Sequence, residues 1–134
     1  MSNIEFSLFV QIKCGNIFRG VVNLKISTRK NGNTIIVLLD GELDHHTAEK
    51  VRTKLDLELI SGGVKNMIFD FSKVSFMDSS GIGVIIGRQK NVARLGGKTA
   101  VVGMNAQTRK ILELTGFKGI IPFFESIEQA SKAM

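Results

Sequence analysis

The first regular pattern in the chain is a pair of apolar, strand-like segments with a turn between them. Residues 22–27 and 34–40 are rich in Val, Ile and Leu, and Asn31-Gly32 lies between them. Apolar and β-branched residues favour strands. An Asn-Gly pair between two such segments is a strong hairpin signal because both residues tolerate the positive φ angles of a tight turn. The pattern predicts a β-hairpin over residues 22–39.

Downstream of the hairpin, helical and strand-like patterns alternate. Between residues 45 and 60, apolar residues recur at the spacing of one helix face, at Ala48, Val51, Leu55 and Leu59. Similar patterns predict strands at 65–71, 98–104 and 117–124, and helices at 79–95, 105–116 and 126–134. Strands that alternate with helices after an initial hairpin predict an α/β fold whose sheet is parallel over its later part.

Residue types at the ends of these segments support the helix boundaries. Gly62-Gly63 and Gly96-Gly97 follow the first two predicted helices, and glycine commonly ends a helix. Asn105 and Ser126 are of the types that cap helix N-termini, and Gly116 is expected just after the end of the third helix.

The first 20 residues allow two interpretations. From residue 4 to residue 13, apolar and polar residues alternate, with Phe9 as the exception, and this is the pattern of a half-buried strand. The alternative is that translation starts further downstream, near Val21 or Val22. We therefore divide the chain into an N-terminal extension, residues 1–20, and a domain, residues 21–134.

The composition is that of one globular domain. Of the 134 residues, 43% are hydrophobic and 22% are charged, which is ordinary for a folded chain with a real core. Cys14 is the only cysteine, so neither an intrachain disulfide nor a cysteine-built metal site can form. A single cysteine suits a reducing compartment, no apolar run is long enough to span a membrane, and the N-terminus does not resemble a secretory signal. We expect a cytoplasmic protein.

The formal net charge of +6 does not predict nucleic-acid binding. The lysines and arginines are scattered along the chain, which contains no Tyr or Trp. A basic patch interleaved with stacking aromatic residues is therefore missing. We expect neither direct nucleic-acid binding nor membrane binding, and we interpret the charge as a solvated surface. Electrostatic steering toward an acidic protein partner is the alternative.

Residues 73–87, KVSFMDSSGIGVIIG, run from a strand-like segment into a glycine-spaced helix. Gly81, Gly83 and Gly87 resemble a dinucleotide-binding fingerprint, but their spacing is G-x-G-x-x-x-G and they lie within the helix rather than in a loop before it. Gly83 and Gly87 share a helix face, so we predict that they let a neighbouring element approach closely. The sequence also lacks a Walker-type loop, and we expect no cofactor.

Residue types for catalysis and for metal binding are present but poorly arranged. The candidates for a triad are a serine (Ser79 or Ser80), a histidine (His45 or His46) and an aspartate (Asp44 or Asp78). MDSSG is not the G-x-S-x-G motif of serine hydrolases, and the two adjacent histidines splay apart, which also argues against a metal site. We expect instead a polar helix entrance in which Asp44 or Thr47 caps backbone N–H groups, with no catalytic residue and no metal.

A serine at the start of a helix can also accept a phosphate. Such a serine is exposed and lies near unpaired N–H groups at the positive end of the helix dipole, where anions bind readily. A phosphate at Ser79 would add about −1.5 to −2 charges beside Asp78. A capping serine with no further role is the alternative, and the chemistry alone does not exclude it.

Two segments resemble the signature segments of one bacterial family. GELDHHTAE at 41–49 and SFMDSSGIGVIIGR at 75–88 are similar to those of the anti-sigma factor antagonists, single STAS domains, and most similar to the stage II sporulation type. The resemblance covers roughly residues 22–134 and leaves the first 20 residues without a counterpart. It implies a single α/β STAS domain, a mixed β-sheet with an N-terminal hairpin and later parallel strands, flanked by about four helices.

The resemblance also implies a mechanism in the regulation of transcription. In this family the unphosphorylated protein binds a serine kinase that is also an anti-sigma factor, and thereby releases the sigma factor. The kinase uses ATP to phosphorylate the first serine after the motif aspartate, which ends binding, and a phosphoserine phosphatase restores the protein. The resemblance makes Ser79 the acceptor, Ser80 a neighbour that is not the main acceptor, and Asp44 a residue of the adjacent loop. The protein would be an anti-anti-sigma factor of sporulation and not an enzyme.

Helix periodicity adds a candidate binding surface. One apolar stripe of the second helix should face the sheet, at Val84, Ile85, Val92 and Leu95. Ile82 and Ile86 form a second apolar strip beside Ser79. We predict that the kinase-binding surface consists of the residues around Ser79 on both loops, namely Glu42, Asp44, Asp78, Ser80, Ile82 and Ile86. The alternative is that both isoleucines pack under the next helix.

A different function is compatible with the same fold. The protein would then be a STAS partner subunit of a lipid transporter or of a stress-signalling complex. Such a subunit would bind its partners without phosphorylation by an anti-sigma kinase. The two functions are distinguished by whether phosphorylation of Ser79 changes partner binding.

Overall fold

The structure, a computed structural model, describes the backbone of residues 4–13 and 21–134 and the side chains of residues 24–117 and 119–134. Strands and helices follow one another in the order β1 (Ile4–Lys13), β2 (Val21–Asn31), β3 (Thr34–Leu43), α1 (Ala48–Ile60), β4 (Asn66–Met77), α2 (Ser79–Arg94), β5 (Thr99–Val102), α3 (Ala106–Leu114), the 3-10 helix η1 (Phe117–Gly119), β6 (Phe123–Phe124) and α4 (Ile127–Lys132).

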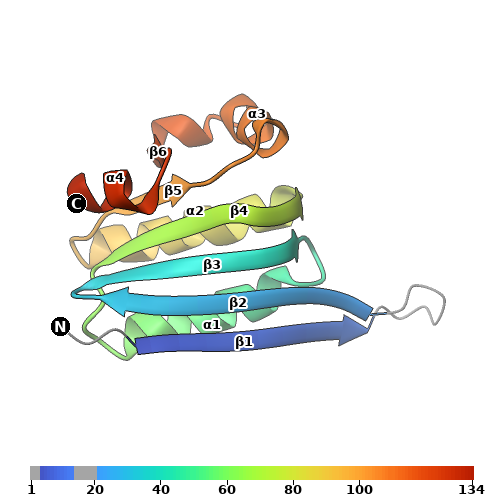
Figure 1. The fold of residues 1–134 in the computed structure, drawn as a ribbon, viewed down its shortest axis with the longest axis horizontal. Coiled ribbons are helices and arrows are strands. Elements are labelled where there is room, and N and C mark those ends of the chain that lie inside the picture. The colour runs from blue at the N-terminus through green and yellow to red at the C-terminus, as the bar shows by residue number, and fades with distance from the viewer. Residues whose placement is uncertain (1–3, 14–20) are drawn as a thin grey trace.

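At the centre lies a six-stranded mixed sheet whose strands keep the order of the chain, β1 to β6 (Figure 1). β2 pairs antiparallel with β1 and with β3, whereas β3 to β6 are each parallel to the next strand. Parallel neighbours need a crossover connection, which α1 provides between β3 and β4 and α2 provides between β4 and β5. The predicted mixed α/β sheet is confirmed.

The predicted hairpin is present, with a turn one residue later than expected. Asn31 pairs with Thr34, so Asn31 is the last residue of β2 and the loop consists of Gly32 and Asn33. Gly32 has a φ of 63°, and Asn33 does not have a positive φ. A positive φ at the first loop residue is the type II′ pattern, in which glycine is favoured at that position.

The N-terminal segment forms an additional strand at the edge of the sheet. β1 pairs with β2 from Ile4, opposite Lys30, to Lys13, opposite Val21. The strand that the first interpretation predicted is therefore present in the structure. The domain boundary at residue 20 and the start of the natural chain stay predictions.

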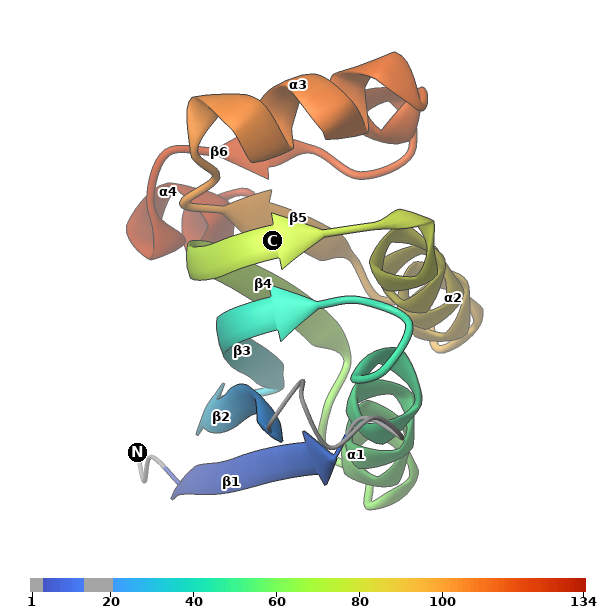
Figure 2. The same ribbon diagram turned by 90° about the vertical axis from the view of Figure 1, so that its right-hand side faces the viewer.

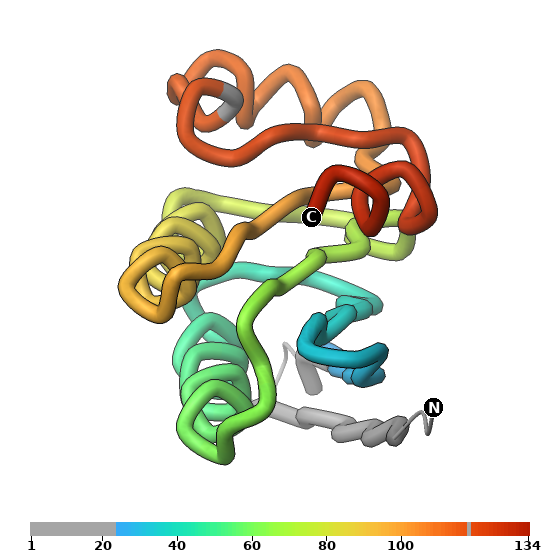
Figure 3. The backbone as a smooth tube through the Cα atoms, turned by 90° about the vertical axis from the view of Figure 1, so that its left-hand side faces the viewer, coloured from blue at the N-terminus to red at the C-terminus, as the bar shows by residue number. Residues whose placement is uncertain are grey.

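Helices cover the two faces of the sheet unequally. Figures 2 and 3 show α1 and α2 side by side on one face and α4 on the other. The main core lies between the sheet and α1 and α2, and it includes Leu55, Phe69, Val84 and Ile85, all fully buried. A smaller cluster lies under α4, around Ala130. The C-terminal ends of β3 and β4, where α1 and α2 begin, are thereby fixed side by side.

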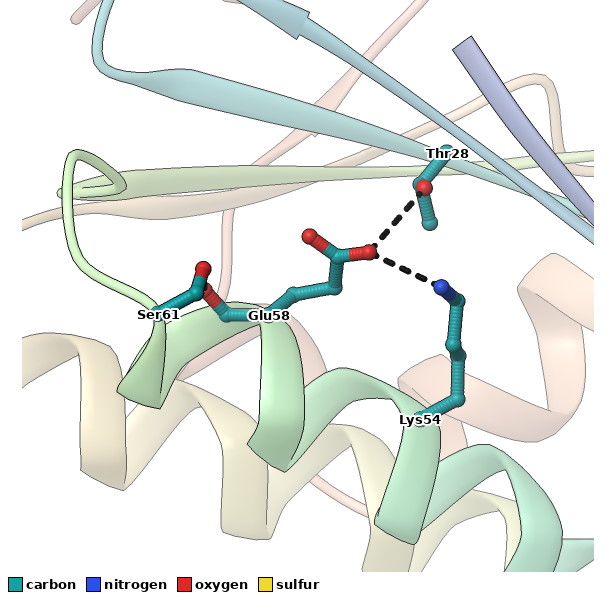
Figure 4. Close-up of polar contacts among 4 residues, drawn as sticks. All are labelled: Thr28, Lys54, Glu58 and Ser61. Carbon is teal, nitrogen blue, oxygen red and sulfur yellow. Dashed lines mark hydrogen bonds and ion pairs between the residues drawn. The ribbon is translucent and has the colours of Figure 1, made fainter. Parts of the chain in front are cut away.

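One polar residue of α1 lies within the buried layer. Glu58 is 8% exposed, and its carboxylate accepts hydrogen bonds from Thr28 of β2 and from Lys54 one helical turn earlier (Figure 4). The buried face of α1 therefore runs through Ala48, Val51, Leu55 and Glu58, and Leu59 is only half-buried. A buried carboxylate is tolerated here because it is hydrogen-bonded and paired.

Two predicted segments differ from the structure. Residues 117–124 were expected to be one strand, but they form η1 followed by the two-residue β6. Phe117 and Ile121 are buried in the main core, and the N–H of Ile121 donates to the carbonyl oxygen of Phe117 at 2.9 Å, which closes a helical turn in place of a strand. Leu95 was expected to face the sheet with Val84, Ile85 and Val92, but it is 53% exposed because the helix ends at Arg94.

The close approach predicted at Gly83 and Gly87 is wrong. A side chain at either position would meet no atom within 4 Å. Around α2, the close contacts are instead at Gly81, where α2 begins against the end of β3, and at Gly97, which lies against the backbone of Lys65. The four-residue spacing identified a shared helix face but did not show whether that face was covered.

Candidate functional site

The predicted site residues lie where β3 and β4 end next to each other. Leu43 and Met77 are paired in the parallel register, so the loop before α1 and the start of α2 emerge from the same edge of the sheet. The backbone N–H of Asp78 donates to the carbonyl oxygen of Leu43 at 3.3 Å. This pairing brings together segments that carry the two signature motifs, and residues 33 positions apart in the sequence come into contact there.

Asp78 is the N-cap of α2 and also joins the two loops. Its Oδ1 accepts hydrogen bonds from the backbone N–H groups of Ser80 at 2.8 Å and Gly81 at 3.2 Å. Its Oδ2 accepts a hydrogen bond from the backbone N–H of His45 at 3.2 Å. One carboxylate therefore holds the start of α2 and the loop that carries Asp44 in a fixed arrangement.

Ser79 is the first residue of α2 and is exposed. Its hydroxyl makes no hydrogen bond to any residue that the structure describes, so the capping role considered for a serine belongs to Asp78 instead. The N–H groups of Ser80 and Gly81, which would otherwise be available to a phosphate, are already bonded to Asp78. Ser80 is half-buried. Of the two serines, Ser79 is the accessible one.

The loop before α1 is closed by its own hydrogen bonds. Asp44 Oδ1 accepts from the N–H groups of His46 at 2.9 Å and Thr47 at 3.2 Å. The Thr47 hydroxyl donates to the carbonyl oxygen of Glu42 at 2.8 Å. The predicted polar helix entrance is present, but Asp44 binds N–H groups of the turn before α1, and the N-cap Thr47 makes no side-chain hydrogen bond to the first turn of the helix, so the predicted cap is wrong.

The catalytic and metal interpretations find no geometric support. His45 contacts Asp78 through its backbone N–H, and neither histidine ring is hydrogen-bonded to a serine of the described chain. Among the residues with described placement, no group of three His, Cys, Asp or Glu side chains is arranged to hold a metal ion. The helices of the described ranges are also too short or too polar to cross a membrane.

The predicted apolar strip next to Ser79 is partly accessible. Ile82 and Ile86 are half-buried and pack against the main core. Each side chain therefore has one part in contact with the core and another part exposed. Glu42 is exposed at the end of β3. Phe76, which pairs with Glu42 across β3 and β4 and is 50% exposed, was not predicted. An aromatic residue two positions before the motif aspartate is the signal that could have identified it.

Removing the Asp78 carboxylate is expected to destabilise the domain. Asp78→Ala leaves the N–H groups of Ser80, Gly81 and His45 without their acceptor, and loss of an N-cap lowers the free energy of unfolding by about 1–2 kcal/mol. Urea denaturation followed by far-UV circular dichroism measures this change. Ser79→Ala, which removes no hydrogen bond to a described residue, is the control and should leave stability within about 0.5 kcal/mol of the wild type. An equal loss in both variants would contradict the capping role.

The comparisons with known proteins agree with this geometry. The STAS domain family matches residues 25–130. The anti-sigma F factor antagonist of Paenibacillus polymyxa is 35% identical over 105 residues, 78% of this chain and 90% of that protein. The structure of the anti-sigma factor antagonist SpoIIAA in its unphosphorylated form matches with a TM-score of 0.71 and 29% identity, covering 81% of this chain and 94% of that one. Phosphorylated SpoIIAA of Bacillus matches with a TM-score of 0.65 and 28% identity, covering 81% and 99%. The chain therefore belongs to the STAS domain family and, within it, to the anti-sigma factor antagonists.

Proposed function

We propose that this protein antagonises an anti-sigma factor and is switched by phosphorylation of Ser79. Its unphosphorylated form binds an anti-sigma factor that is also a serine kinase. This binding releases the sigma factor that the anti-sigma factor had held. The kinase then transfers a phosphoryl group from ATP to the Ser79 hydroxyl, which ends binding. A phosphoserine phosphatase returns the protein to its binding form. The protein itself needs no cofactor and catalyses no reaction.

The observation that carries this proposal is the position of Ser79. Its hydroxyl is exposed at the first position of α2 and is unbonded within the described part of the chain. The adjacent Asp78 fixes the backbone on either side of it. A kinase can therefore reach the hydroxyl without unfolding the helix. Ser80, half-buried and with its N–H bonded to Asp78, is the poorer acceptor.

The surface around Ser79 is suited to binding a protein partner. Glu42 and Asp44 provide carboxylates on the neighbouring loop, and Ile82 and Ile86 provide partly exposed apolar area on α2. Small apolar areas surrounded by polar groups are typical of non-obligate interfaces. We assign the anti-sigma factor to this surface and include Asp78 and Ser80 at its centre.

The arrangement of charges explains why a phosphate would prevent binding. A phosphate on Ser79 would lie beside the Asp78 carboxylate, which already uses the two nearest helix N–H groups. It would add about −1.5 to −2 charges to a position next to an existing negative charge. Burying that phosphate at an interface requires its desolvation next to the Asp78 carboxylate, which weakens the complex.

Phosphorylation by the cognate kinase tests the proposal directly. The protein is incubated with ATP and the anti-sigma factor kinase of the same organism, and the modified residue is identified by mass spectrometry. We expect a single phosphate on Ser79, none on the Ser79→Ala variant, and normal labelling of Ser80→Ala. Labelling of Ser80 in the wild type would reject the assignment. A complex that forms equally well before and after labelling would support the partner-subunit alternative instead.

A further inference from the structure

A second surface lies at the opposite end of the helical layer from Ser79. α1 and α2 run side by side away from the site (Figure 2), and a groove with a volume of about 530 Å³ lies between their C-terminal ends. Its lining consists of Asp56, Leu59, Ile60, Asn91, Arg94 and Leu95. Since Ser79 begins α2 and Arg94 ends it, the helix rise places the groove roughly 20 Å from the phosphorylation site.

The groove exposes large apolar side chains. Ile60 is 79% exposed and Leu95 is 53% exposed, and the half-buried Leu59 lies between the two helices. Single exposed apolar residues are ordinary, but large apolar side chains that gather in one groove mark interaction sites.

Of the charged residues that line the groove, Arg94 is positive and Asp56 is negative, and Asp56 is also paired with Arg88, which lies behind the groove rather than in its lining. Arg88 is 7% exposed, and its Nε lies 3.1 Å from Asp56 Oδ1 in an ion pair without hydrogen-bond geometry. Its Nη1 is buried and has no hydrogen-bond acceptor among the described residues. Asn91 donates to the same Asp56 oxygen at 3.4 Å and accepts from Arg94 at 3.2 Å. The Asp56 carboxylate therefore contacts Arg88 directly and Arg94 through Asn91, so one negative charge is shared by two guanidinium groups.

A third arginine, Arg52, adds positive charge near Arg88. Burial lowers the pKa of the Arg88 guanidinium from its ordinary value, Asp56 opposes that shift, and the positive charge of Arg52 adds to it. The nearby positive charge of Arg52 and the unbonded Nη1 both indicate that Asp56 alone does not fully compensate Arg88. Arg88 itself is buried behind the groove, so the arginines open to a partner's carboxylates are the exposed Arg52 and Arg94.

We propose that the groove binds an amphipathic helix of a partner protein that presents carboxylates beside its apolar face. Leucine-type side chains of that helix would lie against Leu59, Ile60 and Leu95, and its carboxylates would pair with the exposed Arg94 and Arg52. Helix-in-groove recognition uses this combination of apolar anchors and flanking charges. A second copy of this chain fits poorly, because a symmetric contact would bring the arginines of the two copies together and each copy carries a formal net charge of +6.

The separation from Ser79 has a regulatory consequence. The groove shares no residue with the surface assigned to the anti-sigma factor, so both can be occupied at once. Screening at physiological salt acts over about 8 Å, which is shorter than the distance between the two ends of α2. Binding in the groove is therefore independent of phosphorylation, and the protein can remain attached to the second partner in both states.

Nuclear magnetic resonance with designed peptides tests this inference. The probe is a synthetic amphipathic helix with leucines on one face and glutamates beside them, and the control peptide has lysines in place of the glutamates. With ¹⁵N-labelled protein, we expect saturable shifts of the backbone amides of residues 56–60 and 91–95. The acidic peptide should bind at least about tenfold more tightly than the basic one.

Variants separate a local effect from overall charge. Arg94→Glu and Leu95→Ser change exposed side chains and should each weaken binding of the acidic peptide by about tenfold or more, with unchanged circular dichroism. Lys110→Glu, an equal charge reversal at an exposed residue of α3 that does not line the groove, should change affinity by less than about twofold, because charges outside the groove are screened by salt. Ser79→Asp should bind the peptide as the wild type does, whether or not the Ser79 switch itself is correct.

Three results would overturn the inference. The first is no saturable shift in the groove with the acidic peptide, and the second is equal affinity for both peptides. The third is a concentration-dependent dimer in analytical ultracentrifugation that Leu95→Ser abolishes, because the groove would then be covered by a second copy of the chain.

Discussion

Ser79→Asp is expected to weaken binding to the anti-sigma factor by about a hundredfold or more. The aspartate places a negative charge at the first position of α2, directly beside the Asp78 carboxylate. Neither Ser80 nor Gly81 can neutralise it, because their N–H groups already donate to Asp78. A loss of about 3 kcal/mol at the interface corresponds to this change in Kd. Isothermal titration calorimetry with the purified kinase measures the Kd.

Two further variants determine whether the effect belongs to this position. Ser79→Ala should bind as tightly as the wild type, and its complex should persist after ATP is added because the acceptor hydroxyl is gone. Ser80→Asp, with the same charge one residue further along α2, should weaken binding less, because Ser80 is half-buried rather than exposed. Wild-type affinity in the Ser79→Asp variant, with unchanged circular dichroism, would mean that Ser79 lies outside the interface.

The order of the elements could be predicted from the sequence because its signals are local. The Asn-Gly turn, the glycines that end helices and the caps Asn105 and Ser126 act within a few residues, and both caps are present as predicted. The predicted boundaries were wrong where more than one local structure suits the sequence. Between Phe117 and Phe124 the chain forms the helical turn of η1, with Phe117 and Ile121 in the main core, against the strand propensity of the segment.

The site could be predicted only in part for a similar reason. The motifs identified Asp44, Asp78 and Ser79, but no local pattern specifies the hydrogen bond between Asp78 Oδ2 and the N–H of His45. That contact depends on the parallel register of β3 and β4, with Leu43 opposite Met77. The exposure of Phe76 likewise depends on irregular pairing, because the register shifts between Gly41 and Glu42 and changes which side chains face outward.

Gly81→Ala is expected to lower the free energy of unfolding by about 1–3 kcal/mol, the usual cost of inserting a group into a packed site. The new Cβ would lie 2.6 Å from the carbonyl oxygen of Leu43 and 2.9 Å from Cγ of Met77. The carbonyl cannot move away easily, because it accepts the backbone hydrogen bond of Asp78. A domain of this size has a total stability of about 5–15 kcal/mol, so the change is large.

Gly83→Ala is the matched variant, two residues further along the same helix. A Cβ there would meet no atom within 4 Å, and replacing glycine by alanine in the interior of a helix raises stability by about 0.5–1 kcal/mol. Urea denaturation of both variants should therefore give stability changes of opposite sign.

Because the clash at Gly81 pushes the start of α2 away from β3, Gly81→Ala should also weaken binding to the anti-sigma factor by displacing Ser79 from the Asp44 loop. If both variants shift stability in the same direction, the contact between Gly81 and Leu43 is not what distinguishes the two glycines.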